Sequence, residues 1–295
     1  MRLGRPYRRR RQPLDSVAFF KRSVLVFGIL LLIALLVAAP IWALWPLEVE
    51  EATVSITDMP SQLKNLKIAF ASDFHYSAGQ TSLSLRAVKK LNELGADIVI
   101  LGGDYGDTPE DSIAFFESMP AFTARVGVFA VLGDTDRDTE HLQLLLATMK
   151  SKGITPLMNG VEAVKIGGQY LYVAGLDDAV NGSPDTSAIL ERVTSQDTVI
   201  LVAHNPCVLS DLQESQSSRH WFDLGLFGHT HGGQIRIGSW SPFESLVEDV
   251  PERYLGGWVE ENRASLLISN GVGYEGLPLR LLATPQVHLI TLKVR

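Results

Sequence analysis

Five short apolar runs, each ending in a cluster of polar residues, constrain the fold of this chain most. Their richness in Val, Ile, Leu and Phe predicts buried strands, and stretches with helical spacing separate the first three. Strands that alternate with helices predict an α/β fold of stacked layers rather than an all-β fold. The five runs cover residues 66–72, 97–101, 126–132, 198–203 and 224–227. Further strands are predicted at 161–166, 170–174, 264–269 and 287–292, and helices at 83–94, 112–119, 141–150, 187–193 and 208–213.

The polar clusters after these strands predict one shared site. In open α/β sheets, ligands bind beyond the carboxyl ends of the strands, so five such clusters can converge. A single Asp-x-His or Gly-Asp in a loop is usually a solvated turn, and the prediction therefore depends on all five together. The clusters are Ser72-Asp73-Phe74-His75, Gly102-Gly103-Asp104, Gly133-Asp134-Thr135-Asp136, Ala203-His204-Asn205-Pro206 and Gly228-His229-Thr230-His231-Gly232-Gly233-Gln234.

Imidazoles and carboxylates dominate these clusters. That mixture suits Mn, Fe or Zn better than Mg or Ca, which prefer oxygen ligands alone. Seven candidates are too many for one ion and predict two divalent ions that share a carboxylate. The candidates are Asp73, His75, Asp104, Asp134, His204, His229 and His231. The remaining histidines (His141, His220 and His288) are interpreted as surface or structural residues, and Arg280 as structural rather than phosphate-binding.

The order D-x-H, G-D, G-x-x-D, H and G-H-x-H resembles the calcineurin-like metallophosphoesterases over residues 64–295. The Gly232-Gly233-Gln234 ending and the segment ISNGVGYEGLPLR at 268–280 resemble the membrane-associated branch of that family. The resemblance implies a four-layer αββα sandwich with two mixed sheets, and hydrolysis of a phosphoester or phosphoanhydride by water activated between two metal ions. It implies that Asp73, His75 and His231 hold one ion, that Asp134, His204 and His229 hold the other, and that Asp104 bridges them.

The third motif departs from the family pattern Gly-Asn-His-Asp/Glu. Asp134 replaces the Asn and is a good metal ligand, but Thr135 replaces a His implied to assist the leaving group. Loss of a general acid removes a factor of about 10²–10⁴ in rate. We therefore expect a slow enzyme, with Asp136 as a partial substitute, or a substrate whose leaving group needs no acid. The alternative is a catalytically impaired, membrane-tethered metal-binding module of a complex.

The N-terminal region predicts a membrane anchor. Residues 24–45 carry no charge. This run has about the length that spans a bilayer as a helix. Eight Lys and Arg residues precede this run, and acidic residues follow it. The positive-inside rule then predicts a basic cytoplasmic segment at 1–23, a transmembrane helix at 24–45 and an extracytoplasmic domain at 50–295 of an inner-membrane protein. A cleaved signal peptide ending near Val37-Ala38-Ala39, or a twin-arginine signal at 8–11, remains an alternative.

The distribution of charge limits the classes of partner that the protein can bind. Residues 1–22 carry a net +7, so the rest of the chain carries −14 of the overall −7. A body this acidic is a poor binder of nucleic acid, which requires clustered cations. The anchor instead brings a phosphorylated small molecule or a lipid-linked substrate into reach. Cys207 is the only cysteine, which excludes a disulfide within the chain.

Overall fold

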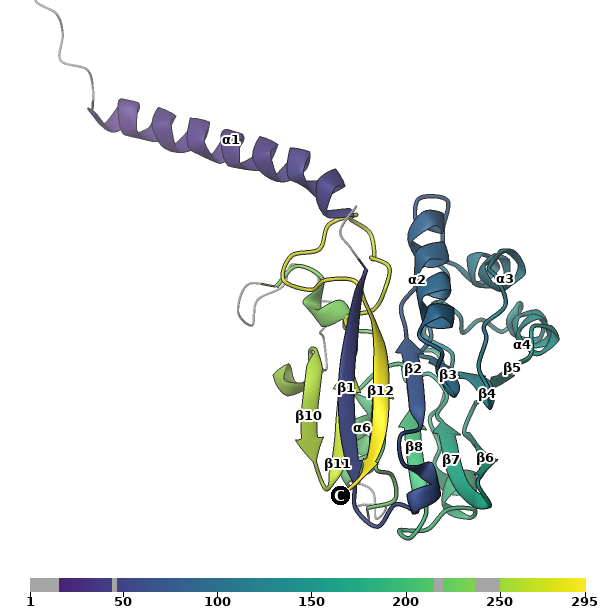
Figure 1. Cartoon of the computed structure of the whole chain (residues 1–295). Coiled ribbons are helices and arrows are strands. Elements are labelled where there is room, and N and C mark those ends of the chain that lie inside the picture. The colour runs from purple at the N-terminus through teal and green to yellow at the C-terminus, as the bar shows by residue number, and fades with distance from the viewer. Residues whose placement is uncertain (1–15, 44–46, 215–219, 237–249) are drawn as a thin grey trace, which may run out of the picture. The chain divides into compact units, whose positions relative to one another are not determined.

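The computed structural model describes residues 16–43, 47–214, 220–236 and 250–295, and the chain divides into two units (Figure 1). The first unit contains helix α1 (Ser16–Ala43), whose large apolar side chains from Phe19 to Ile33 are exposed. Among the residues described, no helix is both long enough and apolar enough to cross a membrane. The transmembrane segment at 24–45 therefore stays a prediction, and its last two residues lie outside the described part of the chain.

The second unit, residues 45–295, contains two six-stranded mixed sheets. The first has the order β1 (Glu48–Ile56), β12 (Gln286–Val294), β2 (Lys67–Ala71), β3 (Ile98–Leu101), β4 (Gly127–Ala130) and β5 (Ile154–Pro156). The second has the order β10 (Gly257–Glu261), β11 (Ala264–Ile268), β9 (Leu224–Phe227), β8 (Thr198–Val202), β7 (Gln169–Gly175) and β6 (Gly160–Ile166). Neighbouring strands are parallel except in the pairs β12–β2, β10–β11 and β6–β7.

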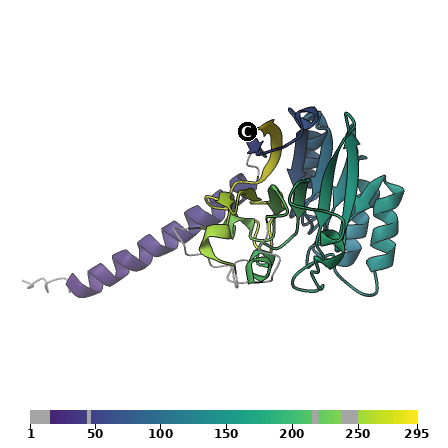
Figure 2. The ribbon, with the colours of Figure 1, turned by 90° about the horizontal axis from the view of Figure 1, so that it is seen from below.

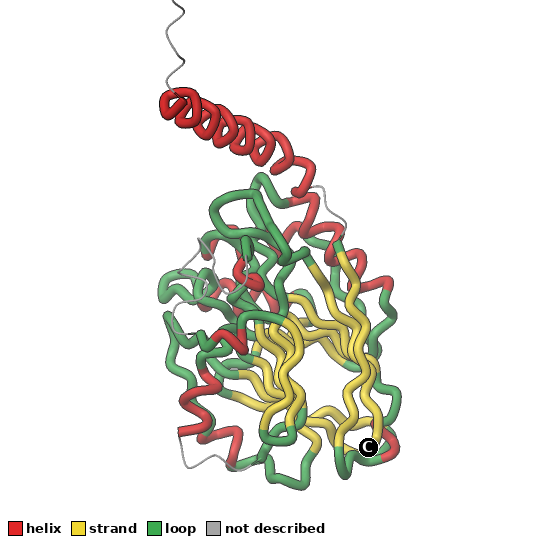
Figure 3. The backbone as a smooth tube through the Cα atoms, turned by 90° about the vertical axis from the view of Figure 1, so that its left-hand side faces the viewer, coloured by secondary structure: helices red, strands yellow, loops and turns green. Residues whose placement is uncertain are grey.

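Helices cover the outer face of each sheet, and the two sheets face one another (Figures 2 and 3). Helices α2 (Thr81–Glu93), α3 (Pro109–Ser118) and α4 (Leu142–Ser151) pack on the first sheet through a core that includes Phe115. A second core, with Phe70 and Val202, fills the space between the sheets. A third, with Phe227, lies between the second sheet and helices α5 (Ser187–Leu190) and α6 (Val208–Glu214). Three cores separate four layers, so the predicted arrangement of two mixed sheets between helices is confirmed.

Three strands were not predicted. Strands β1 (EVEEATVSI) and β10 (GWVEE) lie at the edges of their sheets, and each has a neighbouring strand on one side only. Such strands can carry acidic residues, so neither shows the apolar run that marks a buried strand. Strand β5 contains just three residues. The helix expected at 187–193 is shorter than predicted and ends at Leu190. These elements lie at sheet margins, so their omission leaves the site-bearing strands unaffected.

Candidate metal centre

The five polar clusters follow strands that run parallel within each sheet. In the first sheet, Ala71 of β2 lies beside Leu101 of β3, which lies beside Ala130 of β4. In the second, Val202 of β8 lies beside Leu226 of β9. The loops after these strands therefore leave each sheet at one edge. The structure brings all seven predicted residues into two groups: Asp73, His75 and His231 in the first, and Asp104, Asp134, His204 and His229 in the second.

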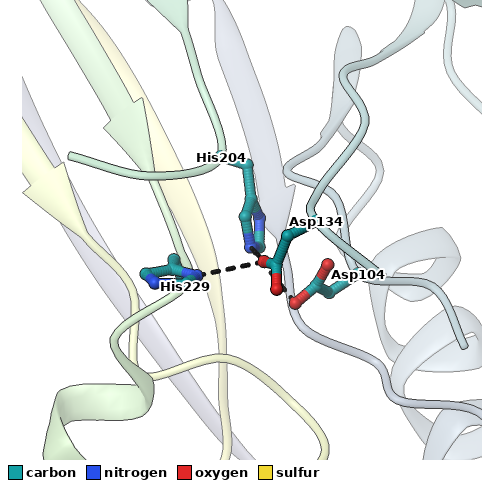
Figure 4. A group of neighbouring side chains, drawn as sticks. All are labelled: Asp104, Asp134, His204 and His229. Atoms are coloured by element: carbon teal, nitrogen blue, oxygen red, sulfur yellow. Dashed lines mark hydrogen bonds and ion pairs between the residues drawn. The ribbon is translucent and has the colours of Figure 1, made fainter. Parts of the chain in front are cut away.

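In the second group, two loops from each sheet contribute one side chain each, and the four side chains point toward one another (Figure 4). The Nε2 atom of His204 lies 3.2 Å from Asp104 Oδ2 and 3.3 Å from Asp134 Oδ1. On the other side of that carboxylate, His229 Nδ1 lies 3.2 Å from Asp134 Oδ1. The arrangement concentrates two imidazoles and two carboxylates around one small volume.

The first group lies beside the second, and Asp104 of the second group is close to both. Its two imidazoles meet with His75 Nε2 and His231 Nε2 3.0 Å apart, and His231 Nε2 lies 3.6 Å from Asp73 Oδ1. Across the groups, His75 Nε2 lies 3.6 Å from Asp104 Oδ2. That oxygen of Asp104 therefore faces an imidazole from each group.

Five of the seven candidates hold a left-handed backbone conformation. Their φ angles are 54° at Asp73, 44° at His75, 55° at Asp104, 69° at His229 and 51° at His231. Residues other than glycine seldom adopt positive φ, and each such residue costs about 1–3 kcal/mol. Strain of this kind persists where the surrounding structure enforces it, and it gathers at functional sites.

Two glycines make room for the carboxylates. A Cβ atom at Gly133 would lie 2.1 Å from Asp104 Oδ1, and one at Gly228 would lie 2.6 Å from Asp73 Oδ2. Both distances are far shorter than any van der Waals contact. The carboxylates can therefore occupy these positions only because the neighbouring backbone lacks a side chain.

The tautomer of His204 favours cation binding. His204 Nδ1 donates a hydrogen bond to the Gly102 carbonyl at 2.7 Å, so its Nε2 carries a lone pair rather than a proton in the neutral ring. That Nε2 atom is buried and has no hydrogen-bond partner within the described residues, although two carboxylates lie near it. A divalent cation would satisfy all three groups at once, so the residues fit a metal ion.

Electrostatics in the absence of a cation agree with this assignment. Burial opposes ionisation of Asp134, but the nearby imidazoles of His204 and His229 hold its pKa well below the ordinary value. Burial also opposes protonation of His204, but Asp104 and Asp134 raise its pKa well above the ordinary value. In this state, a proton on His204 would supply positive charge beside the carboxylates. A bound cation would replace it.

Thr135 lies against Asp104. Its backbone N–H and its hydroxyl both donate to Asp104 Oδ1, at 3.1 and 2.9 Å. The hydroxyl is therefore engaged in orienting the candidate bridging carboxylate. Asp136, considered as a substitute for the missing acid, is fully buried and accepts hydrogen bonds from the N–H groups of Asp104, Tyr105 and Gly133. A carboxylate enclosed by these donors cannot reach a substrate, so that expectation was wrong.

Arg280 is structural, as expected. It is 5% exposed, and its guanidinium donates to the carbonyls of Gly273, Asn270 and Ala283. It also lies 3.1 Å from His231 Nδ1. Because its donors are used on the protein's own backbone, Arg280 fastens the 270–283 loop to the first group and is not needed for a substrate phosphate.

Several residues beyond the seven candidates lie near the centre, and two of them, Asp177 and Asp178, were missed in the sequence. Asp107, three residues after Asp104, lies 3.1 Å from His75 Nδ1 and can orient that ring. Asp177 and Asp178 follow β7 as the other clusters follow their strands, so the same strand-end rule could have found them. Asp177 pairs with Arg137 at 3.0 Å, and Asn181 donates to the Asp134 carbonyl at 2.9 Å. This turn therefore braces the loop that carries Asp134.

Comparison with known proteins identifies the family. The family profile of calcineurin-like phosphoesterases matches residues 66–233. The phosphodiesterase YaeI of Escherichia coli is 32% identical over 235 residues, which cover 77% of this chain and 82% of YaeI. The metallophosphoesterase YkuE of Bacillus subtilis is 27% identical over 252 residues, covering 84% of this chain and 86% of YkuE. A transmembrane protein with a metallophosphoesterase domain from Danio rerio is 25% identical over 305 residues, covering 99% of this chain and 68% of that protein. The chain belongs to the calcineurin-like phosphoesterase family.

Proposed function

We propose that this protein hydrolyses phosphoesters or phosphoanhydrides with two divalent cations of the Mn, Fe or Zn type held by the seven residues of the metal centre. The observation that carries the proposal is the position of Asp104 Oδ2, which faces His75 Nε2 at 3.6 Å and His204 Nε2 at 3.2 Å. When bound, two such cations lower the pKa of a water molecule and stabilise negative charge on the phosphoryl oxygens.

The protein's own residues set up this chemistry. Asp73, His75 and His231 would hold one cation, and Asp134, His204 and His229 the other, with Asp104 between them. Burial, together with the charges of His75 and Arg280, lowers the pKa of His231 well below its ordinary value, so that ring favours the neutral form that a metal ligand requires. Three carboxylates offset most of the charge of two divalent ions, and the remaining positive charge attracts a phosphate.

The leaving group limits the choice of substrate. The hydroxyl of Thr135, which replaces the family His, is bonded to Asp104 and is too weak an acid to protonate an alkoxide. Phosphoanhydrides and activated phosphodiesters place less demand on an acid, and they are the favoured substrates. The name of the relative YaeI, a phosphodiesterase, supports the diester class.

The N-terminal region is the basis for a proposal about where the substrate lies. We propose that residues 24–45 anchor the protein with its N-terminus in the cytoplasm and residues 50–295 outside it, so that a lipid-linked or extracytoplasmic phosphate is in reach. The exposed apolar side chains of α1, such as Phe27 and Leu30, support this proposal. The transmembrane relative from Danio rerio, whose match covers 99% of this chain, supports it as well.

The test is hydrolysis of p-nitrophenyl phosphate and bis-p-nitrophenyl phosphate by the full chain in detergent, with added Mn²⁺. We expect metal-dependent turnover, with the diester preferred, and its loss in Asp104→Asn. If the wild-type protein binds the metal but turns over neither substrate, the catalytic proposal fails. In that case the protein would be a membrane-tethered metal-binding module of a complex.

A further inference from the structure

Two buried glutamines clamp the consecutive residues Tyr274 and Glu275, on the loop between β11 and β12. Gln80 Nε2 donates to the Tyr274 carbonyl at 2.9 Å, and the Tyr274 N–H donates to Gln80 Oε1 at 3.0 Å. Gln234 forms the same pair of bonds with Glu275: its Nε2 donates to the Glu275 carbonyl, and its Oε1 accepts from the Glu275 N–H, both at 2.8 Å. The glutamines are 2% and 0% exposed, so their bonds are shielded from water. This loop lies beyond residues 66–233, the part of the chain that the family profile matches.

The clamps fasten this dipeptide to both ligand loops of the first group. Gln80 precedes α2, on the segment that continues from His75. Gln234 directly follows the short turn His231–Gly233. The Gly273 N–H, in addition, donates to the Asp73 carbonyl at 2.6 Å. Every ligand of the first group is therefore within a few residues of a bond that positions Glu275.

The backbone of Glu275 is fixed, but its carboxyl group is free. Within the described residues, this half-buried carboxyl group makes no hydrogen bond and no ion pair. The pKa of this carboxyl group is raised, chiefly by burial. The charges of Asp104 and Asp134 also raise it, whereas those of His75 and His229 lower it. Those four charges come from both groups of the metal centre. The carboxyl group therefore lies close enough to both groups for their charges to act on it, although it forms no ion pair with any of the seven candidate ligands.

We propose that Glu275 is the proton donor to the leaving group, the role that the family pattern gives to a His at the position of Thr135. The inference rests on the proposed hydrolysis. Thr135 and Asp136 are both engaged with the protein, whereas Glu275 has a free carboxyl group on a fixed backbone. A half-buried carboxyl group can retain its proton closer to neutral pH than an exposed one, as a general acid requires.

The step balances as an ordinary hydrolysis. The oxygen of a water molecule forms a bond to phosphorus, and that water releases one proton to solvent. The bond between phosphorus and the leaving oxygen breaks, and its electron pair stays with the leaving oxygen. Glu275 transfers its proton to that oxygen and becomes a carboxylate. It then regains a proton from solvent, so no other reactant is consumed.

The experiment is a leaving-group series with full-length Glu275→Gln, in detergent with Mn²⁺. Aryl phosphodiesters with phenols of increasing pKa, from p-nitrophenol to phenol, separate acid catalysis from binding. We expect kcat/KM to change little for the p-nitrophenyl diester and to fall about 10²-fold or more for the phenyl diester. For the phenyl diester, the wild-type rate should decline as pH rises through the pKa of Glu275, and the variant should lack that decline.

Controls separate the possible failures. Glu252→Gln, the same change on an exposed glutamate, should behave as wild type. Metal content and thermal unfolding should be unchanged in Glu275→Gln. An equal loss on every substrate with loss of metal would make Glu275 a ligand, and a wild-type leaving-group dependence would remove it from the reaction; either result overturns the proposal. If the wild-type protein turns over no substrate, the proposed function fails and this inference fails with it.

Discussion

At the scale of single residues, Thr135 changes what its position in the motif does. Its N–H and hydroxyl both donate to Asp104 Oδ1, which leaves Asp104 Oδ2 facing His75 and His204. The family His is implied to act on the substrate, whereas Thr135 acts on the candidate bridging ligand. The substitution therefore exchanges a proton donor for a residue that selects which carboxylate oxygen is available to a cation.

Thr135→Val should weaken metal binding. The change removes the hydroxyl and nearly preserves the shape of the side chain. A hydrogen bond to a charged acceptor contributes about 1.5–3 kcal/mol, so we expect Mn²⁺ affinity to fall by about 10- to 100-fold. Isothermal titration with Mn²⁺ measures this, and Thr135→Ser, which keeps the hydroxyl, should bind nearly as well as wild type. Equal affinities for the Val variant and the wild type would contradict this orienting role.

At the scale of elements, Asp136 ties together two loops and a helix. Its carboxylate accepts from the N–H groups of Asp104 and Tyr105 after β3, and from that of Gly133 after β4. It also accepts from the hydroxyl of Ser112 in α3, at 2.6 Å. The residue considered as a catalytic substitute is thus the connection that sets the spacing of the loops carrying Asp104 and Asp134.

Asp136→Ala should destabilise the fold. It leaves three backbone donors and one hydroxyl without a buried acceptor, and we expect a loss of about 3 kcal/mol in the free energy of unfolding. Urea denaturation of the metal-free protein measures it. Asp138→Ala, on a more exposed neighbour paired with His141, should cost far less. A comparable loss in the two variants would show that the buried connection is not special.

The element scale also shows what could be predicted from the sequence. Strands β2, β3, β4, β8 and β9 are short apolar runs whose faces are largely buried, and the strand-end rule applied to them brought the seven candidate residues together in space. The edge strands β1 and β10 lack such a run. The placement of Glu275 depends on Gln80, whose partner Tyr274 is 194 residues away, and no local pattern contains that information.

At the scale of the whole molecule, the metal centre opposes its own folding when it is empty. Five candidate ligands have strained backbones, and Asp73, Asp104 and Asp134 lie close together. Cations that bind only the folded state offset these costs by mass action. The stability of the protein should therefore depend on metal more than its extensive cores suggest.

Removal of metal should lower the melting temperature. At a free Mn²⁺ concentration of about 100 times Kd, binding stabilises the fold by about 2.7 kcal/mol, equivalent to about 5–10 °C for a domain of this size. Scanning calorimetry before and after chelation measures the shift, and re-addition of Mn²⁺ should restore it. Asp104→Asn should show little shift. An unchanged melting temperature for the wild-type protein would mean that the centre holds no tightly bound cation.

The topology of the first sheet determines when that sheet can close during synthesis of the chain. Strand β12 lies between β1 and β2, so the last strand along the chain separates the first two (Figure 1). All seven candidate ligands and Glu275 precede Gln286, where β12 begins. A growing chain therefore contains all of these residues while one edge of β2 still lacks its neighbouring strand. Closure of the first sheet, and the fixed spacing of the loops around it, must wait until β12 has been made, so we expect the site to reach its final geometry only after all of its ligands have been synthesised.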